Sequence, residues 1–275
     1  MKNIILLALV LLPLVSCSSS REKSSKNKKA DLYYGQGTNL LRSKNYTKAL
    51  KSLIASNKYR PNDSKTLNNL GMAYYFKKSV INATNHIKRS IEINPKNSDA
   101  RMNIATIYLK QGKHDLAEKQ YKSILKDLVY ENQHITYFNL ASIELIRGNK
   151  EKAKKFLKES VAVNENYCPA FYKLGKIAFD EGHYKHAKKM FTEASMGLCY
   201  KIPEPQYYMA MSLIKLNEYY EAEQVLEAMM ENFAMTKWEA TAQNEILRLK
   251  KINSLENTQA LQAKKSKRKF FTPDF

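Results

Sequence analysis

The chain has 275 residues, of which 46 are Lys or Arg and 26 are Asp or Glu, so its formal net charge is +20. Hydrophobic residues make up 44% of it, enough to form a globular core, whereas only 8 residues are Gly and 7 are Pro. No β-branched run alternates with polar residues as an exposed strand would, which excludes β-rich folds and favours an all-α protein. The charge alone selects no partner, because the basic residues are spread along the chain as on an ordinary solvated surface.

The first residues have the pattern of an export signal. Lys2 precedes an apolar stretch from Ile4 to Val15 that is broken only by Pro13. As a helix this stretch would span about 18 Å, short of the ~30 Å hydrocarbon core of a bilayer. We therefore interpret residues 1–16 as a signal peptide and leave them out of the fold.

The residues Leu14-Val15-Ser16-Cys17 resemble the bacterial lipobox, in which the cysteine is lipidated and becomes the mature N-terminus. The resemblance implies a membrane anchor of three acyl chains on Cys17, where a single chain would bind only marginally. The alternative is an ordinary cleavage site beside an incidental cysteine. Ser18 stands where Asp would favour the inner membrane, so we expect the periplasmic leaflet of the outer membrane. Residues 18–29 hold no apolar residue, so residues 17–29 are expected to be the lipidated cysteine and a disordered tether.

Two series of small residues recur in step, at intervals of 34, 34, 36, 34 and 35 residues. This period, with small residues at fixed positions, resembles the tetratricopeptide repeat (TPR). The resemblance implies an all-α, right-handed superhelical solenoid of antiparallel helix pairs, in which the small residues lie where the two helices of a pair approach most closely. The two series are Gly37, Gly71, Ala105, Ala141, Gly175 and Ala210, and Ala49, Ala83, Ala117, Ala153, Ala187 and Ala222.

We predict about six repeats over residues 30–236. Gly112, Gly148 and Gly182 fall in the turn between paired helices, where a left-handed residue is needed. A helix over 237–262 should cap the end of the stack, and residues 263–275 should form a flexible basic tail. The predicted repeats are 30–63, 64–97, 98–133, 134–167, 168–202 and 203–236.

The sequence contains no motif typical of an enzyme: no nucleophile elbow, P-loop or zinc-protease HExxH. His183 and His186 lie one helical turn apart, but no further ligands follow at metal-binding spacing. Gly35-Gln-Gly37 lacks the third glycine of a dinucleotide fingerprint. We therefore expect no catalysis, metal, cofactor, small-molecule substrate or nucleic-acid partner.

Two cysteines besides Cys17 belong to the fifth predicted repeat. Cys168 opens its first helix, and Cys199 lies just past the end of its second. These ends are neighbours in an antiparallel pair, so a disulfide is expected in the oxidising periplasm. The alternative is two free thiols.

By the TPR resemblance, the first helix of each repeat lines a concave groove. Asn69, Asn103 and Asn139 share one position in three consecutive repeats, where their amides could hold a peptide backbone; otherwise asparagine is merely tolerated there. Apolar residues at nearby inward positions suggest a binding groove, or else burial against the next helix or the tail. They are Tyr75, Phe76, Leu109, Phe138, Leu145, Ile146, Tyr172, Phe179, Tyr207, Tyr208 and Met211.

The lipobox, the short polar tether and the six repeats together resemble the pilotins of type IV pilus machines, the PilF, PilW and Tgl lipoproteins. The cysteine pair is most similar to that of Tgl, and no short motif in the chain is diagnostic of secretin binding. The resemblance implies that the partner is a secretin subunit, whose localisation and ring assembly the chain promotes. The alternative function is a periplasmic adaptor lipoprotein for peptidoglycan or lipopolysaccharide assembly complexes.

Overall fold

The computed structural model describes the backbone of residues 3–269, and side chains from Glu22 onward apart from Leu198, Asn253, 256–258 and 260–269. Within this range the chain forms thirteen α-helices and one short 3-10 helix, and no strand. The chain divides into two compact units, Met1–Thr136 and Tyr137–Phe275, which are described separately. The predicted all-α repeat fold is confirmed.

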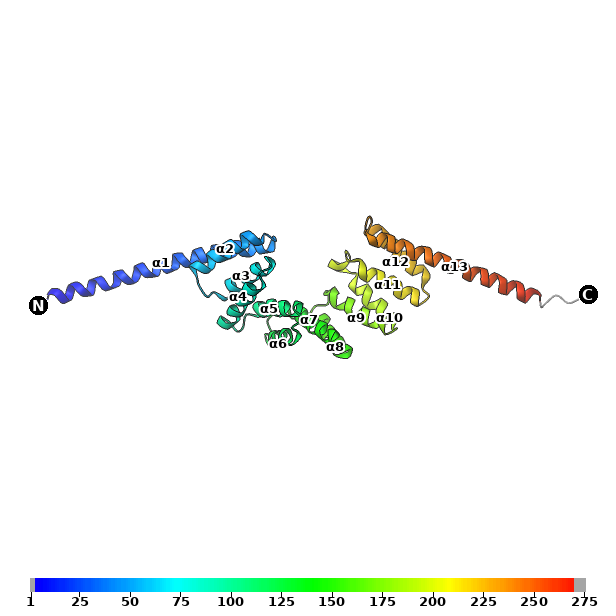
Figure 1. The fold of residues 1–275 in the computed structure, drawn as a ribbon, viewed down its shortest axis with the longest axis horizontal. Helices are drawn as coiled ribbons and strands as arrows, with labels where there is room; N and C mark the ends of the chain where they lie inside the picture. The colour runs from blue at the N-terminus through cyan, green and yellow to red at the C-terminus, as the bar shows by residue number, and fades with distance from the viewer. Residues whose placement is uncertain (1–2, 270–275) are drawn as a thin grey trace, which may run out of the picture. The chain divides into compact units, whose positions relative to one another are not determined.

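Unit 1 contains three antiparallel helix pairs and the start of α7 (Gln133–Ile146), in which the division falls (Figure 1). The first helix of each pair contacts the first helix of the next, α1 with α3 and α3 with α5. The pairs are α1 (Asn3–Arg42) with α2 (Tyr46–Tyr59), α3 (Ser64–Phe76) with α4 (Val80–Ile93), and α5 (Ser98–Lys110) with α6 (His114–Ile124).

Several helices of unit 1 begin at residues whose side chains cap them. Asp63 accepts a hydrogen bond from the backbone N–H of Thr66 at 2.8 Å, and Asn97 accepts one from Ala100 at 3.0 Å. Such caps satisfy backbone donors that have no partner inside the helix. The short polar linkers between pairs therefore also fix where each first helix starts.

The turns inside the pairs all contain a residue with positive φ at the same repeat position. It is Gly112, Gly148 and Gly182 in three repeats, as predicted, with φ of 72°, 80° and 77°. The remaining three repeats place Lys44, Lys78 and Asn217 there, with φ of 60° to 65°. Only glycine adopts this conformation without steric cost, so the two lysines sit in strained turns.

The predicted close approach of paired helices is confirmed at the glycines. A Cβ on Gly71 would lie 2.9 Å from the carbonyl oxygen of Ala83 and 2.5 Å from Ile87 Cγ1. A Cβ on Gly175 would lie 2.7 Å from the Phe191 ring. The small residues of the two series are therefore needed for close packing, because a larger side chain would separate the two helices of each pair.

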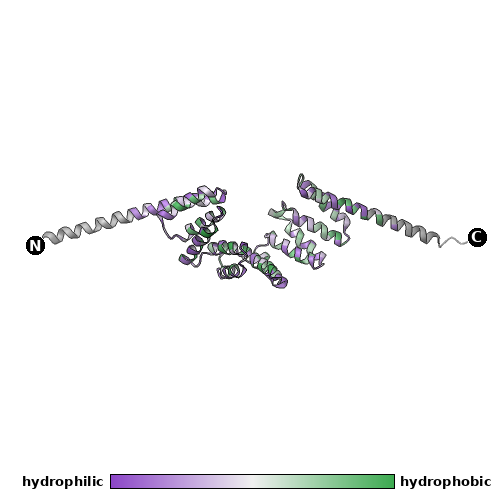
Figure 2. Ribbon diagram, in the orientation of Figure 1, coloured by the Kyte–Doolittle hydropathy of each residue, from purple (hydrophilic) through white to green (hydrophobic). Residues whose placement is uncertain are grey.

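Unit 2 continues the pattern from the rest of α7 to a long terminal helix. Hydrophobic residues recur along its helices between hydrophilic ones (Figure 2), so each helix has one face to bury. Its helices after α7 are α8 (Lys150–Val163), α9 (Cys168–Asp180), α10 (Tyr184–Ala194), α11 (Pro203–Lys215), α12 (Tyr219–Asn232) and α13 (Lys237–Lys269), with the 3-10 helix η1 (Gly197–Cys199) before α11.

The start of α13 covers the last helix pair. Ala242, Ile246 and Leu249 are buried in one cluster with Ala222 and Leu226 of α12, and Trp238 packs against it. A terminal helix of this kind closes the open end of a repeat stack, which would otherwise expose its core.

Both terminal helices are longer than predicted. α1 runs through residues 18–29, where we expected disorder, and α13 continues to Lys269, past the expected end at residue 262. Neither extension contains Gly or Pro, and Glu22 pairs with Lys26 one turn further on at 2.8 Å. Each extension grows from a helix already nucleated by packing, and extending a helix costs far less than starting one.

In the part of the chain that the structure describes, no helix has an apolar stretch long enough to cross a bilayer. The side chain of Cys17 lies outside the described residues. Its lipidation stays a prediction.

Candidate functional site

The two first-helix asparagines of unit 1 are joined in a hydrogen-bonded chain. Asn69 Nδ2 donates to Thr38 Oγ1 of α1 at 2.9 Å, and Asn68 Nδ2 donates to Asn69 Oδ1 at 3.3 Å. Asn103 Nδ2 of α5 then donates to Asn68 Oδ1 at 2.9 Å. Sequence reasoning missed Thr38 and Asn68, because only the packing of neighbouring repeats shows that their side chains complete this amide chain.

The amide chain connects three consecutive first helices, and it also fixes the orientation of each amide. Asn69 and Asn103 are only partly buried, and a primary amide has two N–H donors and two lone pairs. Each amide therefore keeps hydrogen-bonding capacity beyond the bonds within the chain. This arrangement fits contact with a peptide backbone, whose groups alternate donor and acceptor.

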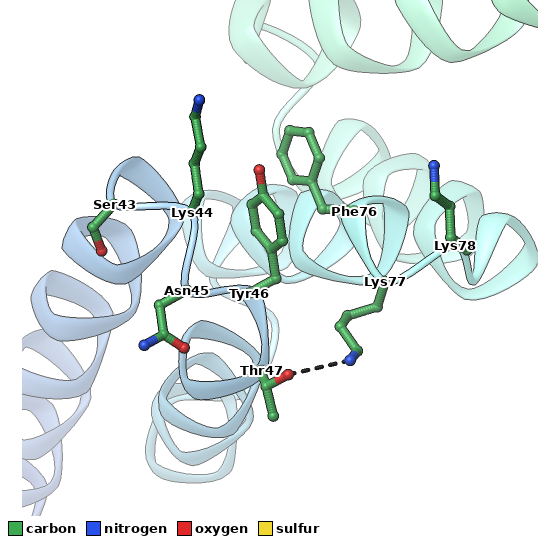
Figure 3. Close-up of a pocket in the computed structure, with 8 residues that line it drawn as sticks. All are labelled: Ser43, Lys44, Asn45, Tyr46, Thr47, Phe76, Lys77 and Lys78. Carbon is green, nitrogen blue, oxygen red and sulfur yellow. Dashed lines mark hydrogen bonds between the residues drawn. The ribbon is translucent and has the colours of Figure 1, made fainter.

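A second feature of unit 1 lies where the first two helix pairs turn (Figure 3). The rings of Tyr46 and Phe76 stack with centroids 4.5 Å apart, and Tyr75 meets Phe76 edge-on at 5.7 Å. Phe76 is 40% exposed. The rings of Tyr46 and Phe76 border an open cavity of about 560 Å³ together with Lys44, Lys77 and Lys78.

The cavity, which we call the turn pocket, combines an apolar wall with a basic rim. Lys44 and Lys78 extend on the same side as the two rings, whereas Lys77 turns to the other side, where its Nζ donates to Thr47 Oγ1 at 3.1 Å (Figure 3). Lys110 of the next repeat lies 5.7 Å from the centroid of the Tyr75 ring. Such a pocket can accept an apolar side chain whose neighbours are acidic, because the exposed rings bury area and the lysines attract negative charge.

In unit 2 the predicted groove residues form an aromatic cluster between α9 and α11. Tyr208 lies 5.6 Å from Phe179, 6.3 Å from Tyr172 and 5.6 Å from Phe191, measured between ring centroids. Tyr207 in turn lies 5.7 Å from Trp238. Tyr172, Phe179 and Tyr208 pack against the buried cluster of Ala178, Ala187 and Phe191, so they support the fold as well as lining this face.

Lys176 places a positive charge on the aromatic cluster. Its Nζ lies 4.0 Å from the Tyr208 centroid and donates to Asp180 Oδ1 at 3.2 Å. Burial alone would lower the Lys176 pKa, but contacts with Tyr208 and Asp180 outweigh it and raise the pKa above its ordinary value. The cluster is therefore a cationic and aromatic surface, a type enriched at protein interfaces.

Phe138 and Leu145 are partly buried and pack against a core cluster of unit 2 that contains Leu157 and Leu174. Phe138 meets Tyr167 edge-on with ring centroids 5.6 Å apart. At these two positions the structure favours the alternative of burial against the next helix over an open groove. Asn139 and Leu109 are half-buried on first helices, and Ile146 is 60% exposed.

A buried carboxylate that sequence reasoning missed lies beside Leu145. Glu144 is 1% exposed; it accepts from Asn149 Nδ2 at 2.9 Å and pairs with Arg147 at 3.3 Å and Lys152 at 3.1 Å. Burial alone would raise the Glu144 pKa, but these bonds and charges outweigh it and lower the pKa. Glu144 thus ties the end of α7 to the start of α8, and it has no solvent access for chemistry.

Cys168 and Cys199 form a disulfide in the structure, with Cα atoms 6.3 Å apart. The bond joins the start of α9 to η1, the two ends that the repeat pattern brings together. The described residues contain no group of three or more His, Cys, Asp or Glu able to hold a metal. His183 is exposed and lies 3.6 Å from Glu181.

Comparison with known proteins agrees with this architecture. The family model described as "Integrator complex subunit 8, TPR repeats" matches residues 73–224, more than half of the chain. No curated protein matches significantly in sequence.

Solved structures share the fold. PilF of Pseudomonas aeruginosa superimposes with a TM-score of 0.70 at 14% identity, over 80% of this chain and 99% of that one. PilW, described as a widely conserved type IV pilus biogenesis factor, gives 0.66 at 16%, over 78% and 98%. YrrB, described as a TPR protein with an unusual peptide-binding site, gives 0.52 at 13%, over 70% and 97%.

Proposed function

We propose that this chain, which belongs to the TPR-repeat family, is a pilotin: an outer-membrane lipoprotein that binds a type IV pilus secretin subunit and promotes its localisation and ring assembly. The observation that carries the proposal is the match to almost the whole length of PilF and PilW, 99% and 98% of those chains. The matched architecture covers the repeats, and the lipobox at Cys17 adds the expected anchor.

The first-helix faces supply the binding chemistry in this proposal. In unit 1 the amide chain offers oriented donors and acceptors to a peptide backbone, and the turn pocket offers Phe76 and Tyr46 to a side chain. In unit 2 the cluster around Tyr208 offers rings and the Lys176 cation. Aromatic anchors with a few polar contacts are the features that carry most binding energy at protein interfaces.

The experiment is purification of the lipidated chain from its own membranes in mild detergent, followed by identification of bound proteins. The proposal expects a secretin subunit at near-stoichiometric yield. Recovery of peptidoglycan or lipopolysaccharide assembly proteins in place of a secretin would instead support the adaptor function.

The anchor is tested separately by Cys17→Ser. The variant should fold normally and leave the membrane fraction after a salt wash. The salt matters because it screens attraction between the basic body and anionic head groups. A variant that stays with outer membranes after the wash would show that Cys17 is not the anchor.

A further inference from the structure

α3 and α5 begin at one edge of unit 1, and α1 passes the same edge near the buried Ala30. Helices joined by short turns are antiparallel, so α1, α3 and α5 run in the same direction. Asp31, near the packed start of α1, pairs with Arg60 at 2.7 Å. Asn97 Nδ2 donates to Ser64 Oγ at 2.8 Å, which brings the next linker beside the start of α3. We call this edge, made by residues 29–31, 60–63, 94–97 and 125–132, the loop edge.

One linker of the loop edge departs from the others. The linkers 60–63 and 94–97 are short and polar, whereas 125–132 is twice as long and contains Leu128 and Val129. Both side chains are 88% exposed. Insertions in repeat proteins commonly lie on the face that makes contacts, and two adjacent apolar side chains at a tip have no role in packing their own unit.

The long linker is held in a defined shape. Ser98 Oγ donates to Asp127 Oδ2 at 2.6 Å, and Gln133 Nε2 donates to the Asp127 carbonyl oxygen at 2.6 Å. Tyr130 Oη donates to Asp99 Oδ1 at 3.2 Å, on the other side of the tip. Leu128 and Val129 are therefore presented by a braced loop.

Positive charge lies directly beside the tip. An open cavity of about 470 Å³ is lined by Leu128 and Val129 and by three cations and one carboxylate: Lys96, Arg101, Lys126 and Asp127, so its charged lining is net positive. Arg101 donates to uncharged acceptors, from Nε to the Pro95 carbonyl at 2.9 Å and from Nη1 to Gln120 Oε1 at 2.8 Å. In the described part of the chain neither lysine forms an ion pair, so both ammonium groups can meet an external anion. Arg101 adds a third positive charge that no carboxylate of the described residues neutralises, although its Nε and Nη1 are already hydrogen-bonded.

We infer that the loop edge of unit 1 docks on an anionic lipid surface, with Leu128 and Val129 inserted among the acyl chains and the cavity beside them receiving a head-group phosphate. An apolar tip flanked by unpaired lysines is the combination that binds membrane interfaces. A protruding apolar tip can insert into the fluid acyl layer of a membrane without a preformed groove in its partner.

The position of the chain's entry supports the lipid surface over a protein partner. α1 enters unit 1 at the loop edge, and Cys17 precedes the buried Ala30 by thirteen residues, about 20 Å of helix. With α1 inclined to the bilayer, Cys17 and the loop tip reach the same leaflet. The inference depends on the proposed function only for the position of the lipid anchor at Cys17. The exposed tip and the cations beside it are observed independently of that anchor.

The test uses the full chain in vesicles of phosphatidylethanolamine and phosphatidylglycerol. Val129→Cys carries an environment-sensitive nitrobenzoxadiazole probe, and the same probe on Ile81→Cys is the matched control. Ile81 is 77% exposed in the same unit but begins α4, at the opposite edge. The unsubstituted chain is labelled in parallel, since label uptake there would show that Cys17 is unacylated.

The expected result is a blue shift and quenching by bromine-labelled lipid at position 129 and neither at position 81. The double substitution Lys96→Gln with Lys126→Gln should lower the partition coefficient of the loop between water and the vesicles about 25-fold, because each lysine near an anionic surface contributes about fivefold. A probe at 129 that reports water in these vesicles overturns the inference, as does one buried only after a protein partner is added.

Failure of the anchor is distinguishable from failure of the loop. If Cys17 takes up label, the anchor proposal is wrong, and the loop is tested in a Cys17→Ser background. There the blue shift at position 129 must still depend on phosphatidylglycerol, or the inference fails on its own account.

Discussion

In unit 1 consecutive first helices are linked by amide and hydroxyl groups, from Thr38 to Asn103, whereas in unit 2 they are linked by rings around Tyr208. The backbone repeat is the same in both. The difference shows that the repeat fixes helix spacing through its small residues and leaves the exposed side of the first helices free to vary. Unit 1 keeps this side polar and partly open, and unit 2 uses it largely for packing.

The substitution with the largest expected effect destabilises unit 2 alone. Cys168→Ser with Cys199→Ser should lower the free energy of unfolding by about 3–4 kcal/mol, because the bond closes a loop of 31 residues in the unfolded chain. Hydrogen exchange should rise in α9 and η1 and stay unchanged in α3 and α4. Equal loss of protection in both units would show that they do not unfold separately.

The buried carboxylate of Glu144 gives a second test of the difference between the two units. Glu144→Gln should destabilise unit 2 by about 2 kcal/mol, since it removes charged hydrogen bonds from a buried site with half-exposed partners. Glu92→Gln in unit 1 is the control, because its partner Arg89 is exposed and such pairs contribute below about 1 kcal/mol.

The Glu144 contribution also depends on pH with a definite sign. Its pKa in the folded protein lies below the unfolded value of 4.5, so the stabilisation is complete above that value and is lost as pH falls through the folded pKa. Unfolding of the unsubstituted chain and of Glu144→Gln should therefore converge in acid. A constant difference between them at all pH values would contradict this account.

Two phenylalanines that look alike in sequence should behave differently. Phe138→Ala should cost about 2 kcal/mol of stability, because Phe138 packs in the core of unit 2. Phe76→Ala should change stability by less than about 1 kcal/mol, because much of its ring is already in solvent. Thermal unfolding of the two variants measures this. Equal melting shifts would show that the turn pocket is also core.

The smallest expected effect is a gain. Lys78→Gly should stabilise unit 1 by about 1 kcal/mol, since Lys78 has φ of 65° and glycine adopts that conformation without strain. Gly182→Ala, at the same position in unit 2, should destabilise it by a similar amount. If both changes shift stability in the same direction, the strain argument is wrong.

The repeat and its turns could be predicted from sequence because Gly71 and Gly112 serve purely local geometry that every repeat shares. The side-chain partners could not. Asn69 reaches Thr38, and Asn103 reaches Asn68, only through the packing of neighbouring repeats. The sequence left open whether Phe138 lines a groove or is buried against the next helix, and the structure buries much of it. Glu144 gave no signal, since a single acid on an apolar helix is indistinguishable from a surface residue until its neighbours are placed.

The central claim is that the exposed first-helix face binds a protein partner. Its most direct measurement is the affinity of the purified secretin subunit for Phe76→Ala, with Ile81→Ala as the control of similar apolar size. A buried aromatic anchor contributes on the order of 2 kcal/mol, so Phe76→Ala should weaken binding about 30-fold and Ile81→Ala should leave it unchanged. Unaltered binding by a folded Phe76→Ala variant would contradict the claim.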